Sequence, residues 1–468
     1  MKRYKLAAAA TLIAVAGLLS VPAAHAAGPT LAAGPGKLTP RFAPKRTDYV
    51  VRCNGAPLSI DVAGAAGWEA RVGPGDFAEG DLGSEDEGTS ATVTTRRTSG
   101  KGKQRRYYVR CLPADFPEYA FERKRKGGPE LFTMQFPNRY AAILNGDGIP
   151  IWWYQATGQP DNVEVLRDGT VAFAPVDATA AQSADYEVHN LKGRLLRKVT
   201  GGGGVIADIH ELLLLPNGNF MLGAADSRSG VDATPYGGEA DSAVLGIDIQ
   251  EVAPDGKVVW NWSSDEHIGL EETGRWWQSI LNTEPYDVVH WNSVDVKGNR
   301  VLLSFRHLDA IYMVNRKTGE IIWKLGGTQT PNSLEVVDDP EGQAPLGGNH
   351  DARFNPDGTI SVFDNNSGLN IPPRAVRYEI DEEAGTATLV ESLSDPDVPG
   401  SFCCGSARRA DDGSWLVAWP LKVGAYDSKH REIFGLTITG GFPYRSLPVN
   451  ERYVSVKDLR RAMNKRKG

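Results

Sequence analysis

One strand-turn-strand pattern recurs five times along this 468-residue chain, each time with a glycine at the same place in the turn. The turns contain pairs such as Asn-Gly, Asp-Gly and Lys-Gly between β-prone runs, and such pairs favour tight hairpins because glycine readily adopts a positive φ. The five turn glycines are Gly169, Gly218, Gly298, Gly358 and Gly413. A hairpin repeated at intervals of about 45 to 80 residues predicts a repeat architecture.

A second signature follows most of these hairpins, a glycine with a tryptophan four residues later. It occurs in Gly148–Trp152, Gly256–Trp260 and Gly319–Trp323, and it predicts an outer hairpin. Two hairpins per unit give a four-stranded antiparallel sheet, and such sheets in a ring form a β-propeller. We therefore predict an all-β chain with a six-bladed propeller, five blades being the alternative count.

Three of the eight histidines share one position in this repeat. His210, His290 and His350 each stand eight residues before a turn glycine. The innermost strand of every blade lines the central channel, so equivalent positions face the same level of the axis. One such histidine alone is most simply a polar strand end, but three in one register predict a cluster. His189, His267 and His430 lie off this register.

The ends of the chain differ in character from its middle. Residues 1–26 have the basic start, apolar stretch and small-residue cleavage site of a secretory signal peptide, so we expect a secreted or extracytoplasmic protein. An uncleaved anchor is the alternative. Residues 27–44 resemble a disordered linker, 45–116 a small β-sandwich and 128–450 the propeller. Residues 451–468 predict a basic helix or tail.

The four cysteines fall into two pairs. Cys53 and Cys111 end two similar strands, and an exported β module favours a disulfide between them. Cys403 and Cys404 are adjacent, just before the repeat position held by Gly405, and we expect a vicinal disulfide, with reduced thiols as the alternative. No further cysteine supports a metal site there.

Charge and hydropathy argue against two kinds of partner, nucleic acid and the membrane interior. The net charge of -7 and the lack of a basic stripe give no reason to expect nucleic acid binding. The part after residue 26 contains no transmembrane segment, so stable membrane insertion is not expected. The sequence does not indicate an oligomeric state.

Residues beside the predicted histidine cluster point to its chemistry. In a strand, Asn292 projects on the same side as His290, and Arg306 on the next strand faces the same place. A guanidinium matches tetrahedral oxyanions, whereas a metal ion gains nothing from a fixed positive charge nearby. We therefore expect an anionic substrate and no metal, with a structural polar plug as the remaining alternative. His307, next to Arg306, should point to the other side of its strand.

Three runs carry a resemblance to a known family. HELLLLPNGN, the run from EPYDVVHWNS to EIIWKLGG, and GGNHDARFNPDGT closely resemble bacterial arylsulfotransferases that use aryl sulfates as donors, over about residues 130 to 450. The resemblance implies a six-bladed propeller, an N-terminal β-sandwich and a location outside the cytoplasm. It also implies transfer of a sulfuryl group between phenols through a sulfohistidine, without the nucleotide donor PAPS or another cofactor.

The resemblance also assigns roles to individual residues. His350 matches the nucleophile, His290 with Asn292 the His-x-Asn pair, Arg306 the strand arginine and His210 the earlier histidine. His210 or His290 would then carry protons, and aryl sulfates and phenols would be the small-molecule partners.

One departure concerns the last channel strand. The family has a hydroxyl residue where this chain has Gly405, so Ser406 is the expected substitute for substrate binding. A hydrolase of sulfate or phosphate esters and a non-catalytic binding propeller remain as alternative functions.

Overall fold

The computed structural model describes residues 28–100, 102–177 and 183–464 as two units, which divide after Cys111. The expected signal peptide, 1–26, lies outside the described residues. None of the described helices has the length and apolar character needed to cross a membrane.

The N-terminal unit is a sandwich of two antiparallel sheets. The smaller sheet has the order β1 (Thr30–Gly34), β3 (Ser59–Ala63), β6 (Leu82–Ser84). The larger has the order β2 (Asp48–Arg52), β8 (Arg105–Leu112), β7 (Ser90–Arg97), β4 (Trp68–Val72), β5 (Ala78–Glu79). Alternate apolar residues of both sheets form one buried core, as period-two patterning predicts.

Two features of this unit bear on the sequence predictions. Cys53 and Cys111 form the predicted disulfide. The stretch 27–44 differs from the expected linker, because β1 pairs with β3 from Thr30 to Gly34 and Thr39 bridges to Val50. Alternating Leu31 and Ala33 give this Gly/Pro/Ala-rich segment enough apolar surface to join the sandwich core.

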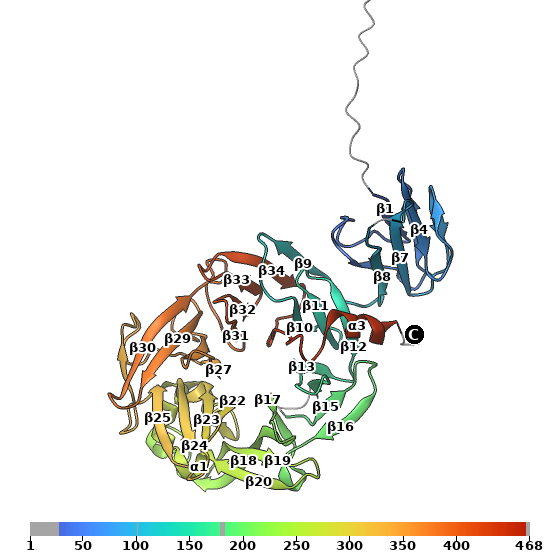
Figure 1. Ribbon diagram of the computed structural model, residues 1–468. Coiled ribbons are helices and arrows are strands. Elements are labelled where there is room, and N and C mark those ends of the chain that lie inside the picture. The colour runs from blue at the N-terminus through green and yellow to red at the C-terminus, as the bar shows by residue number, and fades with distance from the viewer. Residues whose placement is uncertain (1–27, 101, 178–182, 465–468) are drawn as a thin grey trace, which may run out of the picture. The chain divides into compact units, whose positions relative to one another are not determined.

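The second unit is a β-propeller whose sheets surround a central axis (Figure 1). Its described residues contain six sheets. The first sheet comprises β10 (Leu131–Phe136), β11 (Tyr140–Asn145) and β12 (Pro150–Gln155). The second comprises β13 (Gln159–Val165), β14 (Val171–Val176), β15 (Tyr186–His189) and β16 (Leu195–Val199). The third comprises β17 (Ala207–Leu214), β18 (Phe220–Val231), β19 (Ser242–Val252) and β20 (Val258–Ser263), with β21 (Tyr286–Asp287) beside β19.

The other three sheets have the same meandering order. The fourth sheet comprises β22 (Trp291–Lys297), β23 (Arg300–Phe305), β24 (Ala310–Asn315) and β25 (Ile321–Gly326). The fifth comprises β27 (His350–Phe354), β28 (Ile360–Asp364), β29 (Arg374–Asp381) and β30 (Thr386–Leu393), with β26 (Glu335–Val337) beside β30. The sixth comprises β31 (Ser406–Arg409), β32 (Trp415–Ala418), β33 (Val423–Tyr426) and β34 (Glu432–Ile438), with β9 (Tyr119–Arg123) beside β34.

The repeat glycines lie where the pattern predicts them. Each of the five turn glycines has a positive φ and joins the first two strands of its sheet. Gly148, Gly256 and Gly319 also have positive φ and join the last two strands, which are the outer hairpins. The glycine register therefore identifies the innermost strands β13, β17, β22, β27 and β31.

Both ends of the propeller chain complete sheets made mainly by the opposite end. β9 pairs with β34 as the outermost strand of the last sheet. In the first sheet, Leu131 and Thr133 of β10 exchange backbone hydrogen bonds with Leu447 and Val449, so residues near the C-terminus supply the inner edge. These two exchanges close the ring without a covalent bond.

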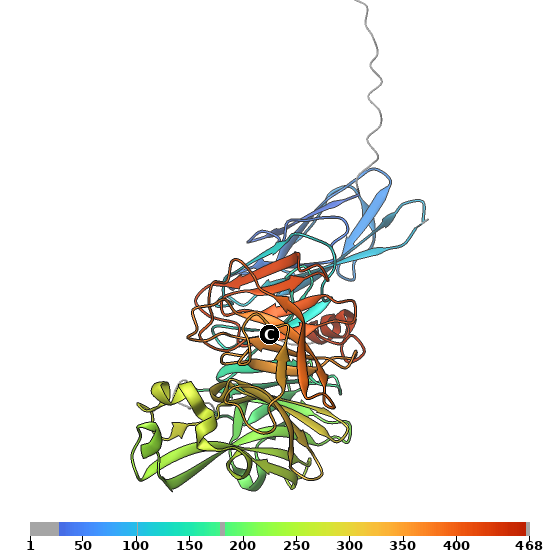
Figure 2. The ribbon, with the colours of Figure 1, turned by 90° about the vertical axis from the view of Figure 1, so that its left-hand side faces the viewer.

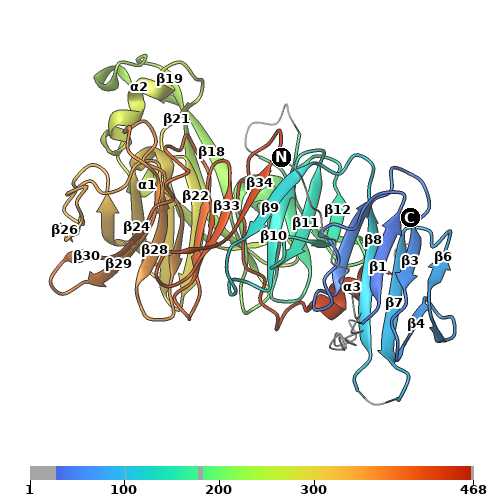
Figure 3. The same ribbon diagram turned by 90° about the horizontal axis from the view of Figure 1, so that it is seen from above.

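Short helices occur in the connections. They are α1 (Ser264–His267), α2 (Trp277–Ile280), α3 (Val456–Met463) and the 3-10 turns η1 (Gly202–Gly204), η2 (Thr234–Tyr236), η3 (Leu270–Trp276) and η4 (Arg306–Leu308). The insertion that carries α1, η3 and α2 follows β20, the last strand of the third sheet (Figure 2). Its α2 and the strand β21 extend beyond one face of the blades (Figure 3).

Candidate functional site

The three histidines of the repeat register come together at the propeller axis. His210 lies in β17, His290 directly precedes β22, and His350 begins β27. The ring centroids of His210 and His290 are 5.1 Å apart, and both residues lie near enough to His350 to affect its pKa. We call His210, His290 and His350 the axial histidines. Their partners differ, and the partners determine what each imidazole can do.

Two axial histidines are held by carboxylates. The Nδ1 atom of His210 lies 2.7 Å from Oδ1 of Asp208, and Nδ1 of His290 contacts Oδ2 of Asp287. A hydrogen bond at Nδ1 turns Nε2 away from the carboxylate and fixes the ring plane. Burial, followed by the charges of His210 and Arg306, lowers the pKa of His290 well below its ordinary value. The resting His290 is therefore neutral.

His350 has only neutral partners. Its Nδ1 lies 2.9 Å from the carbonyl oxygen of Gly348 and 2.7 Å from Oδ1 of Asn365. A carbonyl only accepts, so Nδ1 carries the hydrogen and Nε2 keeps its lone pair. The amide of Asn365 is itself fixed, because its nitrogen donates to the carbonyl oxygen of Cys404 at 2.7 Å. Burial and the charge of Arg306 lower the pKa of His350 well below its ordinary value.

Arg306 is positioned by a turn that the sequence did not indicate. β23 ends at Phe305, and η4 turns the chain so that the backbone N–H of Arg306 donates to the backbone carbonyl oxygen of His290 at 2.8 Å. The guanidinium lies 4.2 Å from the ring centroid of Trp276 and donates through Nη2 to the carbonyl oxygen of Phe402 at 3.0 Å. Burial lowers the pKa of Arg306 to about 10, which leaves it charged at neutral pH. Its Nε–H has no acceptor among the described residues.

His307 lies on the site and not on the opposite side of a strand. Its ring centroid is 4.6 Å from that of His290, and its Nε2 accepts a 2.6 Å hydrogen bond from Nη1 of Arg306. Its Nδ1 donates to the backbone carbonyl of Asp287 at 2.6 Å. The strand alternation used for the prediction fails here because η4 replaces the strand.

The donor atoms of Asp287, His290 and His307 lie within 4.8 Å of one another, a spacing that a metal ion could use. The lone pair at Nε2 of His307, however, is taken by Arg306, and a fixed guanidinium at this distance disfavours a cation. The arrangement fits an anion better, and a metal-free site stays a prediction.

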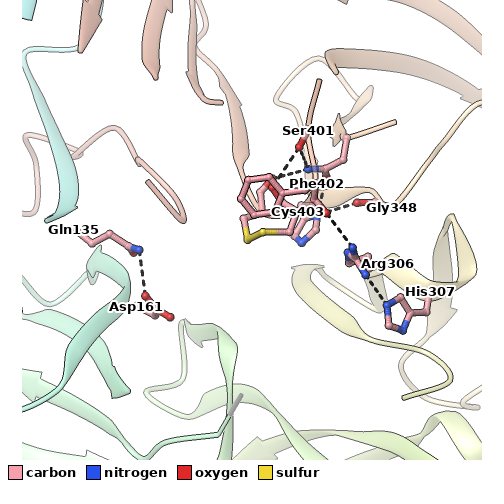
Figure 4. The surroundings of a disulfide bond; sticks show 11 residues. Gln135, Asp161, Arg306, His307, Gly348, Ser401, Phe402 and Cys403 are labelled. Atoms are coloured by element: carbon pink, nitrogen blue, oxygen red, sulfur yellow. Dashed lines mark hydrogen bonds between the residues drawn. A yellow bond between two sulfur atoms is a disulfide. The ribbon is translucent and has the colours of Figure 1, made fainter. Parts of the chain in front are cut away.

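The segment before β31 connects Arg306 with His350. Cys403 and Cys404 are joined by a disulfide, as the adjacent pair predicted. On one side, Phe402 accepts from Arg306, and on the other, Ser401 and Cys404 accept from the amide of Asn365 (Figure 4). One short segment thus orients both the cation and the partner of His350.

Asn292 and Ser406, two predicted site residues, are both fully buried and bonded to other parts of the chain, and their predicted roles stay predictions. The amide nitrogen of Asn292 donates to the carbonyl oxygen of Asn349 at 2.8 Å, and the side chain is fully buried, so it braces the strand that begins at His350. The alternation argument fails because His290 has a φ of 46° and lies outside the strand that starts at Trp291. The hydroxyl of Ser406 donates to the carbonyl oxygen of Ser446 at 3.1 Å and is fully buried.

Gly405 stands where the resemblance implied a hydroxyl residue, and its surroundings explain the glycine. Its φ is 119°, and a Cβ there would lie 2.4 Å from the ring of Phe363. A larger residue at this position would need the Phe363 ring to move. Two other hydroxyl residues lie beside the site: Ser401 accepts from the amide of Asn365, and the ring centroid of Tyr444 is 5.9 Å from that of His210.

Below the histidines the axis is filled by paired charges. Glu211 lies 3.0 Å from Nη1 of Arg445 and also pairs with Arg353, while Asp351 accepts from Arg353 at 2.8 Å and from Arg408 at 2.7 Å. The arginines hold the pKa of Asp351 well below its usual range. Asp351 is therefore engaged by arginines and does not orient His350.

Several residues at the site escaped the sequence analysis. Asp208 and Asp287 could have been suspected, because each stands two or three residues before an axial histidine. Trp276, whose ring supports Arg306, lies in an insertion that the repeat pattern does not cover. Asn365 is separated from His350 by 15 residues, and no local pattern links the two.

Comparison with known proteins supports one family. Residues 187–419 match the family model described as Arylsulfotransferase (ASST). No curated protein matches the chain. Among solved structures, a protein of unknown function from Bacteroides caccae is 13% identical with a TM-score of 0.43, covering 69% of this chain and 100% of its own. BamB from Moraxella catarrhalis is 10% identical with a TM-score of 0.30, covering 74% and 90%. The matched segment contains all three axial histidines, and through residues 187–419 the chain belongs to the arylsulfotransferase family.

Proposed function

We propose that the protein transfers a sulfuryl group from an aryl sulfate to a phenolic acceptor through a sulfohistidine on His350. The observation that carries the proposal is the hydrogen bonding of His350. Two acceptors hold its Nδ1–H, and a lowered pKa keeps the ring neutral, so Nε2 presents a lone pair to an electrophile.

Arg306 supplies the binding site for the sulfate. Its planar guanidinium stays charged, and its Nε–H has no acceptor among the described residues. The ring of Trp276 and the carbonyl of Phe402 keep the guanidinium in place before substrate arrives. Preorganised positive charge of this kind stabilises negative charge that builds on the equatorial oxygens during transfer.

The reaction then has two halves. Nε2 of His350 attacks sulfur, the bond between sulfur and the aryl oxygen breaks, and the phenolate leaves with the electron pair. In the second half an acceptor oxygen attacks sulfur, the S–N bond breaks and its electrons return to His350. Because His350 holds the sulfuryl group between the two halves, the kinetics are ping-pong. His210 and His290 flank the path of the proton that each phenol must gain or lose.

One assay tests the transfer. The purified protein is mixed with 4-nitrophenyl sulfate, with and without phenol. Release of nitrophenol that depends on phenol, together with formation of phenyl sulfate, is the expected result. Release without phenol indicates a hydrolase, and no release indicates a binding propeller for this donor.

The nucleophile is tested by the His350→Ala variant, with His430→Ala as control. His430 is partly exposed and bonds Glu391 away from the site. We expect His350→Ala to abolish turnover and to prevent sulfuryl labelling of the protein in a mass spectrum, while His430→Ala retains both. Full activity in His350→Ala would rule out the assignment.

We also propose that the protein works outside the cytoplasm. Two disulfides in one chain support an oxidising compartment. Cell fractionation and N-terminal sequencing of the mature protein test this, with cleavage after residue 26 expected.

A further inference from the structure

We propose that Asp161 is the general base that takes the proton from the acceptor phenol, and that it returns this proton to the phenolate of the next donor. The proposal rests on the proposed function and assigns a proton transfer that His210 and His290 had been expected to share. It adds a catalytic residue to the site.

The first argument is the position of Asp161 in the ring. Asp161 lies in β13 eight residues before Gly169, the same register as the axial histidines. β13 belongs to the second of the six sheets and His350 begins the innermost strand of the fifth. The second and fifth positions of six are opposite, and Figure 1 places β13 and β27 on opposite sides of the axis. Asp161 therefore faces His350 across the centre of the ring.

The second argument is the geometry of displacement at sulfur. The attacking and leaving atoms lie on opposite sides of the transferred group in an in-line displacement. With His350 on one side, the phenol oxygen lies on the other side in both half-reactions. A proton carrier is needed there, and the side opposite His350 is that of Asp161. His210 and His290 belong to the two intervening sheets and flank this line.

The third argument is the state of the carboxyl group. Nε2 of Gln135 in β10 donates to Oδ1 of Asp161 at 3.1 Å, which fixes the side chain, while Oδ2 has no partner among the described residues. Figure 4 shows Gln135 and Asp161 apart from the group formed by Arg306 and Cys403, on the other side of the site. The side chain is only partly buried, so the free oxygen is available to a phenol.

The electrostatic surroundings suit a base near neutral pH. Burial raises the pKa of Asp161 to about 6, and the facing His210 and the hydrogen bond from Gln135 limit the rise. Asp161 also acts on Tyr444, whose pKa is raised, chiefly by burial, so that Tyr444 stays neutral. A carboxylate with a raised pKa accepts a phenolic proton more readily than an exposed one while remaining ionised at pH 7.

The test separates the two half-reactions. 4-Nitrophenyl sulfate labels the protein, and the burst of nitrophenol reports the first half, which needs no acid because nitrophenolate is a good leaving group. The labelled protein is then given either phenol or pentafluorophenol, which is already ionised in the assay. Asp161→Asn removes the base at constant shape, and Asp255→Asn, on an exposed turn of another blade, is the control.

We expect Asp161→Asn to retain the burst and to lose transfer to phenol by about 10²-fold or more, with transfer to pentafluorophenol nearly unchanged. Equal loss for both acceptors, or no loss, would overturn the proposal. The same acceptor-dependent loss in His210→Gln alone would assign the proton to His210 instead. Absence of a burst in the wild type would refute the proposed function itself.

A second variant guards against misfolding. Asp161→Ala leaves space at the carboxylate position, and added formate should restore transfer to phenol in it but not in His350→Ala. A folded Asp161→Ala protein that transfers slowly and gains nothing from formate would contradict a role as base.

Discussion

At the scale of single residues, the partners at Nδ1 divide three similar histidines into two kinds. His210 and His290 contact carboxylates, which fix the ring planes and place negative charge at Nδ1. His350 contacts an amide and a backbone carbonyl, which fix the tautomer without adding negative charge. A neutral ring with a free Nε2 lone pair is what a nucleophile requires.

The first prediction concerns Asn365. Asn365→Asp places a carboxylate on Nδ1 of His350, and an opposite charge at hydrogen-bond distance raises a histidine pKa by about 1 to 3 units. We expect the acid limb of the burst rate to move to higher pH by a similar amount. Asn365→Ala removes the hydrogen bond without adding charge and should slow the burst without that upward shift. An unshifted limb in Asn365→Asp would contradict this role of Asn365.

The second prediction concerns the wild type. The pKa of His350 is lowered, chiefly by burial, so the ring loses its added proton below the ordinary histidine value of about 6.5. The nucleophile is therefore still unprotonated at pH 6, and the burst rate with 4-nitrophenyl sulfate should stay level through pH 6.5. A rate that falls to half near pH 6.5 would show an unperturbed imidazole.

At the scale of elements, the segment 401–404 holds the site together without belonging to a strand. It receives hydrogen bonds from Arg306 and from Asn365, which directly follow strands of two different sheets. Adjacent cysteines enclose almost no chain, so their disulfide adds little loop-closure entropy and acts on local shape. The pair Cys53–Cys111 encloses a long loop and acts on stability.

The third prediction contrasts these two disulfides. Replacing Cys403 and Cys404 by serine should slow sulfuryl transfer by about ten- to a hundredfold through misplacement of Arg306, with little change in urea unfolding. Replacing Cys53 and Cys111 by serine should destabilise the N-terminal unit by roughly 2 to 5 kcal/mol and leave the transfer rate unchanged. Equal effects of the two replacements on the transfer rate would refute the distinction.

At the scale of the whole molecule, charges on the axis link different sheets. Arg445 is fully buried and donates to Glu211, to Asn162 at 3.2 Å and to the backbone carbonyl of Asn292 at 2.6 Å. These contacts join the C-terminal segment to three different sheets. Removing one member of a buried ion pair leaves the other charge without compensation.

The fourth prediction follows from this burial. Arg445→Met should lower the free energy of unfolding by about 3 to 5 kcal/mol. Arg300→Met, which breaks an exposed pair with Glu382, should change it by at most about 1 kcal/mol. Chemical denaturation of both variants measures the difference. A cost for Arg445→Met no larger than that for Arg300→Met would show that the axial charges do not support the ring.

The sequence predicted the parts of the molecule that depend on local geometry. Turn glycines need a positive φ, so Gly169 and its equivalents marked the inner hairpins and, through them, the shared register of the histidines. Matching strand ends likewise predicted the Cys53–Cys111 disulfide.

The errors occurred where the backbone departs from regular strands. The positive φ of His290 broke the alternation that linked it to Asn292, and η4 brought His307 onto the site. Contacts such as His350 with Asn365, or Arg306 with Phe402, join residues distant in sequence. Only the closed ring brings these partners together, so no local pattern indicated them.

The exchange of strands between the two ends also sets the order in which the protein can be completed. A chain leaving the ribosome presents β9 early, but β34, its partner, emerges more than three hundred residues later. The inner edge of the first sheet and Arg445 arrive almost last. Such distant pairings fold slowly, because loop-closure entropy must be overcome before the contacts form. The nascent protein therefore has no assembled site until residues 445–449 have been synthesised, and we expect a chain terminated before residue 445 to be inactive.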